Sequence, residues 1–335
     1  MPEQENVLLE LRGIKKYYDV SEGWLSREKK YLHAVDGVDF QVMRGETFSI
    51  VGESGCGKTT LGNVIINLLR PTEGTILFDS VDLTKLSKEE LRKKRADMQM
   101  VFQDPFSSLN PRMSVFDIIA EPLRTHRSTR RQELEGQVLE LMDVVGLDRG
   151  YAMRYPHEFS GGQRQRIGIA RALALKPKLI VCDEPVSALD VSIQAQVLNL
   201  LKRLQKEFDL TYIFIAHGLP AVKHISDRIA VMYMGKIVEM APKMLLFGHQ
   251  YHPYTAGLIA AVPIAEPRLR AGQERKLLSG ELPSPVNPPK GCRFCTRCVY
   301  AQPVCRELDP KLTEVAQGHL AACHFPIPVF ERSKV

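Results

Sequence analysis

Within residues 46–62, the hydrophobic and polar pattern predicts a short strand, a glycine-rich turn and the beginning of a helix. The turn contains Gly52, Gly55 and Gly57, and glycine adopts backbone conformations that side chains forbid. Beyond the turn, apolar residues recur at the spacing of one helix face, namely Leu61, Val64, Ile65 and Leu68. We expect the remaining elements to be arranged around this unit.

Short apolar or alternating stretches predict further strands. Residues 7–14 are predicted as an edge strand, and residues 31–42 hold two apolar stretches around Asp36-Gly37. Later strands are expected at residues 75–78, 97–103, 178–185, 210–216, 229–233 and 236–239. The last two are predicted to form a hairpin around Met234-Gly235.

Residues 111–156 change to a helical pattern, in which apolar residues recur every three or four positions. Gly146 is a plausible stop signal within it, and Ser87 is a plausible N-cap for an earlier charged helix. The pattern predicts a helical subdomain, at about residues 106–158, inserted into an α/β core.

Composition limits the class of protein. The 335 residues are 44% apolar, which suits a chain with a full core and two domains, one of them small. The net charge of +6 lies in short clusters without interleaved aromatic residues, so we expect no nucleic-acid partner. The acidic amino terminus and the lack of an apolar run near the ~18 residues of a membrane span predict a soluble, cytosolic chain without disulfides.

The turn matches the pattern G-x-x-x-x-G-K-[ST], a P-loop that wraps a polyphosphate with backbone N–H groups. Its candidate nucleotide ligands are Gly52, Glu53, Ser54, Gly55, Cys56, Gly57, Lys58, Thr59 and Thr60. Lys58 is expected to reach the β- and γ-phosphates, and Thr59 to offer its hydroxyl to Mg²⁺. Cys56 is explained by its small size, although the positive surroundings should favour its thiolate.

Polar residues follow several of the predicted strands. Asp183 and Glu184 end one strand, and because side chains alternate along a strand they should face different ways. One carboxylate can then hold Mg²⁺ while the other orients or deprotonates a water. The three side chains expected at Mg²⁺ are those of Thr59, Gln103 and Asp183. Gln103 and His217 end two other strands, although a lone Gln at the end of a strand usually has no role beyond ending the apolar pattern.

A second candidate anion site lies where a strong helix begins, at Ser160, Gly161, Gly162 and Gln163. An N-cap serine with a flexible loop explains the beginning of this helix, but it does not explain the double glycine.

With these motifs in order, residues 7–239 resemble the nucleotide-binding subunits of ATP-binding cassette (ABC) transporters. The resemblance implies an α/β P-loop cassette with an antiparallel β subdomain and an inserted helical subdomain. It also implies a dimer that sandwiches two ATP molecules, each between the P-loop of one subunit and the signature motif of the other. The implied roles are adenine stacking for Tyr18, a Mg²⁺-sensing glutamine for Gln103, the signature motif for residues 159–163, the catalytic carboxylate for Glu184, an interface loop ending at Asp190, and the switch histidine for His217.

Two positions depart from that family pattern. The signature begins with Phe159 instead of Leu, which is a conservative change. Gly218 follows the switch histidine where the family usually has Asp, which removes a charge and loosens the backbone beside His217. This second departure raises the hypothesis of a weakly active, regulatory member of a heterodimer.

Beyond Glu239 the resemblance narrows to dipeptide and oligopeptide importers, through segments beginning at His252, Leu278 and Asn287. It implies two domains, a cassette at 1–245 and a carboxyl-terminal extension at 246–335. It also implies a peptide-import ATPase, peripheral on the cytoplasmic face of the inner membrane. The implied partners are a second ATPase subunit that is a paralogue, two permease subunits and an extracytoplasmic peptide-binding protein. The alternative is a soluble cassette ATPase that acts on ribosomes or DNA.

Five cysteines, Cys292, Cys295, Cys298, Cys305 and Cys323, fall within 32 residues and predict a metal site in a small Cys-rich module. Zinc and an iron–sulfur cluster both accept four thiolates, so spacing alone leaves both open. The family resemblance implies that Cys292, Cys298, Cys305 and Cys323 hold a [4Fe–4S] cluster and that Cys295 is an extra thiol. The zinc alternative uses Cys292 and Cys295 as a C-x-x-C pair, and two of Cys298, Cys305, Cys323 and His324 complete the four ligands.

Overall fold

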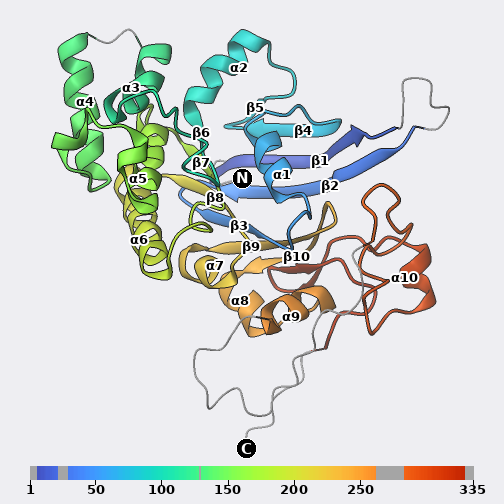
Figure 1. Cartoon of the computed structure of the whole chain (residues 1–335). Helices are drawn as coiled ribbons and strands as arrows, with labels where there is room; N and C mark the ends of the chain where they lie inside the picture. Colours follow the sequence, from blue (N-terminus) through green and yellow to red (C-terminus); the bar gives the residue numbers. More distant parts are fainter. Residues whose placement is uncertain (1–5, 22–28, 128–129, 262–282, 329–335) are drawn as a thin grey trace, which may run out of the picture.

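The computed structural model describes residues 6–21, 29–127, 130–261 and 283–328. Two sheets form its centre (Figure 1): a four-stranded sheet in the order β2-β1-β4-β5 and an eight-stranded sheet in the order β11-β12-β10-β9-β3-β8-β7-β6. The strands are β1 (Val7–Asp19), β2 (Tyr31–Met43), β3 (Thr47–Val51), β4 (Glu73–Phe78), β5 (Val81–Asp82), β6 (Met98–Val101), β7 (Leu179–Asp183), β8 (Thr211–Ala216), β9 (Arg228–Tyr233), β10 (Lys236–Pro242), β11 (Thr313–Ala316) and β12 (His319–Ala321).

Helices cover the large sheet and fill the connections between its strands. They are α1 (Lys58–Ile65), α2 (Lys88–Lys94), α3 (Val115–His126), α4 (Arg131–Val144), α5 (Gly161–Leu173), α6 (Val191–Phe208), α7 (Leu219–Ile225), α8 (Lys243–Gly248), α9 (Pro253–Ala260) and α10 (Pro303–Glu307). As the sequence predicts, residues 111–156 are largely helical, and α3 begins at the N-cap Ser114, whose side chain accepts from the Asp117 N–H.

The middle of the large sheet is parallel. β3 pairs with β8 and β9, β8 with β7, and β7 with β6, all in parallel. Every residue of β3, β7 and β8 is buried, which explains why these strands read as continuous apolar runs. Their carboxyl ends therefore meet at one edge of the sheet.

The small sheet is antiparallel and corrects one prediction. β1 is flanked by β2 on one side and β4 on the other, so the prediction of an edge strand for residues 7–14 was wrong. Its interior position follows from burial, because Leu8, Leu9, Leu11 and Ile14 are all fully or almost fully buried. The partial alternation of apolar and polar residues indicates the two faces of the strand. It does not indicate whether the strand lies at the edge or in the interior of the sheet.

The predicted hairpin is confirmed between β9 and β10. Met234 (φ 43°) and Gly235 (φ 80°) both have left-handed backbone, as the tight turns that match the twist of hairpin strands require. This turn brings Met234 and Gly235 to the cavity described below.

The carboxyl-terminal part of the chain joins the large sheet, since β12 pairs with β10 and β11 with β12 (Figure 1). The fully buried Glu239 of β10 ties the two parts together: it accepts from the N–H groups of Tyr251 (2.8 Å) and His252 (3.0 Å) and from His319 Nε2 (2.7 Å). Residues 278–282 of the peptide-importer motif lie outside the described residues. No helix in the described ranges is long and apolar enough to cross a membrane.

Candidate functional site

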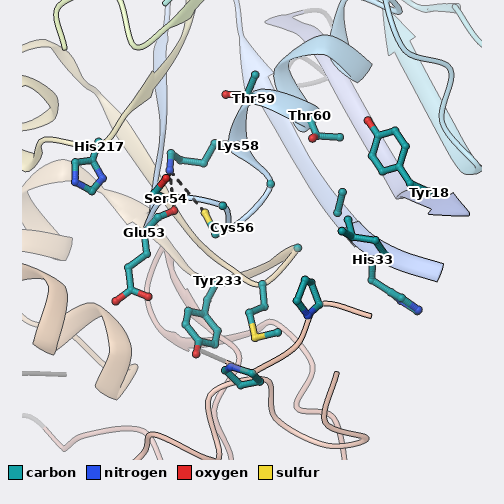
Figure 2. A pocket seen from close by; sticks show the side chains of 18 of the residues that line it. Tyr18, His33, Glu53, Ser54, Cys56, Lys58, Thr59, Thr60, His217 and Tyr233 are labelled. Atoms are coloured by element: carbon teal, nitrogen blue, oxygen red, sulfur yellow. Dashed lines mark hydrogen bonds between the residues drawn. The ribbon is translucent and has the colours of Figure 1, made fainter. Parts of the chain in front are cut away.

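Four parallel strands end at one cavity of about 670 Å³ (Figure 2). The P-loop follows β3, Gln103 follows β6, Glu184 follows β7 and His217 follows β8. Ligands of open α/β sheets bind at the carboxyl ends of such strands. The predicted residues that line the cavity are Tyr18, Glu53, Ser54, Gly55, Cys56, Gly57, Lys58, Thr59, Thr60, Gln103, Glu184 and His217.

The P-loop has the geometry that its glycines predict. Gly57 has a φ of 104° and is the N-cap of α1, while a Cβ on Gly52 would lie 2.1 Å from the carbonyl oxygen of Met232. Lys58 is buried, and its Nζ donates to the carbonyl oxygens of Gly52 (2.9 Å) and Glu53 (3.0 Å). The loop thus holds the ammonium group in place before any phosphate arrives.

Two of the three side chains expected at Mg²⁺ lie together. Thr59 Oγ1 donates to Asp183 Oδ1 at 3.2 Å, and burial raises the pKa of Asp183 to about 6. Oxygen atoms of this kind are the ligands that Mg²⁺ prefers. Gln103 instead donates to Glu184 Oε2 at 2.9 Å. Among the described residues, no group of three or more His, Cys, Asp or Glu side chains has the geometry of a metal site.

Glu184 lies one residue beyond β7 and has a left-handed backbone, with a φ of 46°. Its N–H donates to the carbonyl oxygen of Ile215 at 2.9 Å. Asp183 is buried, whereas Glu184 is partly exposed at the cavity. The two carboxylates differ in environment as predicted, but the reason is the backbone turn at Glu184 and not alternation along a strand. Non-glycine residues rarely adopt this conformation, and when they do it is commonly at functional sites.

His217 lines the cavity, and Gly218 forms the N-cap of α7. Gly218 has a φ of −91° and a ψ of 113°, which other residues adopt without strain, and a Cβ there would meet nothing within 4 Å. The missing aspartate therefore changes the local charge without being required by the fold of this turn.

The cavity wall beside Tyr18 contains residues that the sequence did not single out, including Leu32, His33, Pro283 and Pro285. The N–H of His33 donates to the carbonyl oxygen of Pro285 at 3.0 Å, so the extension reaches strand β2. The proline-rich stretch predicted an extended linker, but no local signal indicated where it lies. Tyr17 donates its hydroxyl hydrogen to Asp36 and does not appear in the wall formed by described residues.

The second predicted anion site lies elsewhere. Ser160 and Gln163 form a capping box at the beginning of α5, and a Cβ on Gly162 would lie 2.4 Å from Ile193 Cγ2 of α6. Close packing against α6 thus explains at least one of the two glycines. Of the described residues, Ser160, Gly161, Gly162, Gln163 and Asp190 are not part of the cavity wall.

Cys56 contradicts the prediction of a favoured thiolate. Its side chain is 5% exposed, and burial raises its pKa although Lys58 Nζ lies 3.8 Å from its sulfur. The loss of water around the thiolate outweighs the attraction of the ammonium group.

The five clustered cysteines surround a second, much smaller cavity of about 20 Å³. Cys292, Cys295, Cys298, Cys305 and Cys323 all line it, together with aromatic side chains that include Phe294 and Tyr300. Thiols thus dominate the lining of this cavity, but no three of them, within the described residues, have the geometry of a metal site. The enclosed space is that of one water or ion, so a cubane cluster would require the thiols to move apart.

Burial favours the protonated form of four of these thiols. It raises the pKa of Cys292 to about 12 and that of Cys323 to about 11, and it also raises the pKa of Cys295 and Cys298. A bound metal would reverse this preference and release protons, because only thiolates are good ligands.

Comparison with known families identifies two segments. Residues 35–187 match the family model described as ABC transporter, and residues 238–305 match the model described as oligopeptide/dipeptide transporter, C-terminal region. The first segment includes the P-loop and the two carboxylates at the end of β7, Asp183 and Glu184. The second includes four of the five clustered cysteines.

Whole-chain comparison gives the same result. The chain is 55% identical to the oligopeptide transport ATP-binding protein AppF of Bacillus subtilis, over 96% of this chain and 98% of that protein. It is 53% identical to the oligopeptide transport ATP-binding protein OppF of Salmonella typhimurium, over 96% and 97%. Among solved structures, the ATP-binding cassette MJ0796, a dimer in a post-hydrolysis state bound to ADP and Pi, superposes with a TM-score of 0.63 at 30% identity, over 70% of this chain and 99% of that one.

Proposed function

We propose a function for this chain on one established premise: it belongs to the family of ABC transporter ATP-binding proteins, in the branch of oligopeptide and dipeptide transporters. The chain is an ATPase whose hydrolysis of ATP powers the import of dipeptides or oligopeptides through a membrane permease. The relatives carry names of the same kind, which favours this function over that of a soluble cassette ATPase acting on ribosomes or DNA.

The observation that carries this proposal is the meeting of the P-loop, Glu184 and His217 at one cavity. The P-loop amides and Lys58 bind the β- and γ-phosphates. Glu184 accepts the proton of the attacking water, and His217 contacts the γ-phosphate, so their placement at the ends of neighbouring strands suits an in-line attack.

The site also suits Mg²⁺. Thr59 and Asp183 already lie within 3.2 Å of each other, and Gln103 reaches the same region through its bond to Glu184. When bound with ATP, Mg²⁺ neutralises charge on the phosphates.

A second ATPase subunit completes the site. Ser160 to Gln163 and Asp190 stand apart from the cavity of their own chain, as expected if they close the nucleotide of a partner. The dimeric state of the related cassette MJ0796 supports this arrangement. We propose that the partner is a paralogue. A regulatory role with weak activity is a second possibility raised by Gly218, although the ordinary backbone at this position gives it no structural support.

The other partners are two transmembrane permease subunits and an extracytoplasmic peptide-binding protein, with no nucleic acid. We place the chain at the cytoplasmic face of the inner membrane, in contact with the membrane only through the permease. We also propose the division into a cassette at 1–245, with helices α3 and α4 as an inserted helical subdomain at about 106–158, and an extension at 246–335.

We further propose that Cys292, Cys298, Cys305 and Cys323 hold a [4Fe–4S] cluster with a structural role, with zinc as the alternative. The convergence of thiols on one cavity supports a metal site. Because that cavity is small, the metal is to be identified by iron and zinc analysis of the purified protein.

The decisive experiment is the substitution Glu184→Gln in the assembled transporter. The amide keeps the phosphate cage but cannot take a proton, so the variant should bind Mg²⁺–ATP normally, lose hydrolysis and accumulate the closed dimer. Glu184→Asp is the matched control, since it keeps a carboxylate and should retain partial activity. Hydrolysis by the glutamine variant at the parent rate would refute the role of Glu184.

A further inference from the structure

The P-loop is joined to the cysteine-rich part of the chain by an ion pair. Arg297 Nη1 donates to Glu53 Oε2 at 2.8 Å and Arg297 Nη2 donates to Glu53 Oε1 at 3.1 Å. The two residues are 244 positions apart, and Arg297 lies directly before Cys298. Paired contacts of this kind fix the orientation of both groups as well as their separation.

This ion pair is sheltered from water. The side chain of Arg297 is 6% exposed and that of Glu53 is 23% exposed. The guanidinium carbon lies 5.9 Å from the ring centres of both Tyr233 and Phe294, within the range of cation–π attraction. Arg297 also donates to the Tyr233 hydroxyl at 3.4 Å. Removing one partner of such a sheltered pair costs more than breaking an exposed pair, because the remaining charge is left without a partner and away from water.

Glu53 is held at its backbone as well as its side chain. Its N–H donates to the hydroxyl oxygen of Tyr254 at 2.8 Å, and its carbonyl oxygen accepts from Lys58 Nζ at 3.0 Å. Phe294 packs against Tyr254 with 5.5 Å between ring centres, so the same loop supports both contacts. The position of Glu53 therefore affects the position of the phosphate-binding lysine.

The charge of Glu53 is a liability for this site. It is the only acidic side chain among residues 52–59, and a free carboxylate would repel the phosphates of a nucleotide. Figure 2 shows its side chain pointing away from Lys58. Arg297 neutralises the carboxylate on the side of the P-loop that faces the extension.

We propose that Arg297 is a positioning residue for nucleotide binding, which acts by holding and neutralising Glu53 of the P-loop. Through it, the loop of residues 292–298 sets the affinity of the site for ATP and ADP. The inference rests on the proposed ATPase function, and it does not depend on which metal the cysteines hold.

The chain supplies a matched control in the same loop. The side chain of Arg293 is 8% exposed, close to the 6% of Arg297, and it also pairs with a carboxylate of the cassette, Asp36 of β2. Asp36 lies outside the P-loop. Loss of Arg293 thus disturbs the same loop to a similar degree without releasing Glu53.

The test measures the Kd of ADP for the purified full-length chain. For Arg297→Gln we expect the Kd to rise about tenfold, which is a typical coupling between two sites, while Arg293→Gln keeps the Kd within about twofold of the parent. Arg297→Lys keeps the charge without the paired geometry and should recover part of the loss. Glu53→Gln should weaken binding less than Arg297→Gln does, because it leaves no unpaired negative charge to repel the phosphates.

The double variant gives the sharpest result. If Arg297 acts through Glu53, then replacing Arg297 in the Glu53→Gln background should change the Kd by less than about twofold. An equal loss in both backgrounds, or an equal loss in Arg293→Gln, would overturn the inference, as would a folded Arg297→Gln protein with the parent Kd.

If Arg297→Gln does not fold, Arg297→Lys in the two backgrounds serves the same comparison. A parent chain that binds no ADP would refute the proposed function instead, so the two failures are distinguishable.

Discussion

The nucleotide cavity and the cysteine cavity of this molecule differ in almost every physical respect. The nucleotide cavity encloses about 670 Å³, and the P-loop with Lys58, together with Gln103, Glu184 and His217, lines it. The cysteine cavity encloses about 20 Å³ and is lined by thiols and aromatic rings. An open site with its donors already placed suits a ligand that enters and leaves, whereas a closed site suits a ligand that stays for the life of the fold.

The two cavities are neighbours joined by one loop. Phe294 packs against Tyr233 and Tyr254, which lie on the nucleotide side, while Cys292, Cys295 and Cys298 face the small cavity. A permanent ligand at the cysteines would therefore act as a support for the exchangeable one. The following variants test this contrast between a permanent ligand and an exchangeable one.

The largest effect is expected at the cysteine cavity. Cys298→Ser should abolish metal binding entirely, because a serine hydroxyl does not replace a thiolate ligand. The parent protein, purified without oxygen, should be brown, absorb near ~400 nm and contain about four iron atoms per chain. Iron and zinc analysis of both proteins checks this.

Cys295→Ser is the matched control for that variant. It should leave the iron content unchanged if a [4Fe–4S] cluster uses the other four cysteines, and it should abolish binding if zinc uses Cys292 and Cys295. A colourless parent with one zinc per chain would decide for zinc. A parent without any bound metal would contradict the contrast between a permanent and an exchangeable ligand.

The next effect concerns pH and the buried His252. Burial lowers the pKa of His252 to about 4, against the opposing attraction of Glu239. The unfolded chain, with a pKa near ~6.5, then binds more protons between pH 6.5 and pH 4, so stability falls as the pH falls through this window. We expect a loss of about 2 kcal/mol by pH 5 from this residue alone.

Urea unfolding of the parent and of His252→Asn at pH 7.5 and pH 5 measures that loss. Asparagine is a good N-cap and can replace the ring nitrogen that accepts from the Tyr254 N–H at 3.1 Å. Asp183, whose pKa is raised, contributes with the opposite sign in both proteins and cancels. Equal pH dependence in the two proteins would show that His252 is not buried as described.

A smaller effect is expected at Thr59. Thr59→Ala removes the hydroxyl that lies beside Asp183, and the affinity for Mg²⁺–ATP should fall about tenfold, the size of one lost hydrogen bond to a charged group. Binding of ADP without Mg²⁺ should change little, and Thr59→Ser should restore the affinity. Titrations with and without Mg²⁺ check this. A similar loss in both titrations would mean that Thr59 acts on the loop and not on the metal.

The smallest effect is expected at Cys56. Because this thiol is buried and its pKa is raised, a maleimide should label it slowly in the folded chain even without nucleotide, and ATP should slow the labelling only a little further. Mass spectrometry of labelled peptides distinguishes Cys56 from the clustered cysteines. Fast labelling of Cys56 without nucleotide would restore the prediction of an activated thiolate.

The sequence predicted what depends on neighbouring residues. The P-loop, the Met234-Gly235 turn and the strand before Asp183 are each encoded within a few positions, through glycine conformations and continuous burial. The three segments meet at one edge because β3, β7 and β8 pair in parallel. The resemblance to ABC transporter subunits implies this pairing through the order of the motifs.

Features that depend on distant contacts were not predictable. The interior place of β1, the addition of β12 to β10 and the contact of Pro285 with His33 each join segments far apart in the chain. Arg297 offers no local signal either, since a basic residue between two cysteines reads as an ordinary surface position. The pairing of Arg297 with Glu53 can be recognised only in the folded structure, where the two segments lie together.

The ion pair between Glu53 and Arg297 also sets an order of events during synthesis. At ~5–20 residues per second, a ribosome adds Arg297 about 12–50 seconds after Glu53. Throughout that interval the carboxylate of Glu53 has no arginine partner, and its neighbour Lys58 has only part of its final surroundings. The P-loop is thus synthesised early, but its contacts are complete only after the carboxyl-terminal part of the chain has been synthesised.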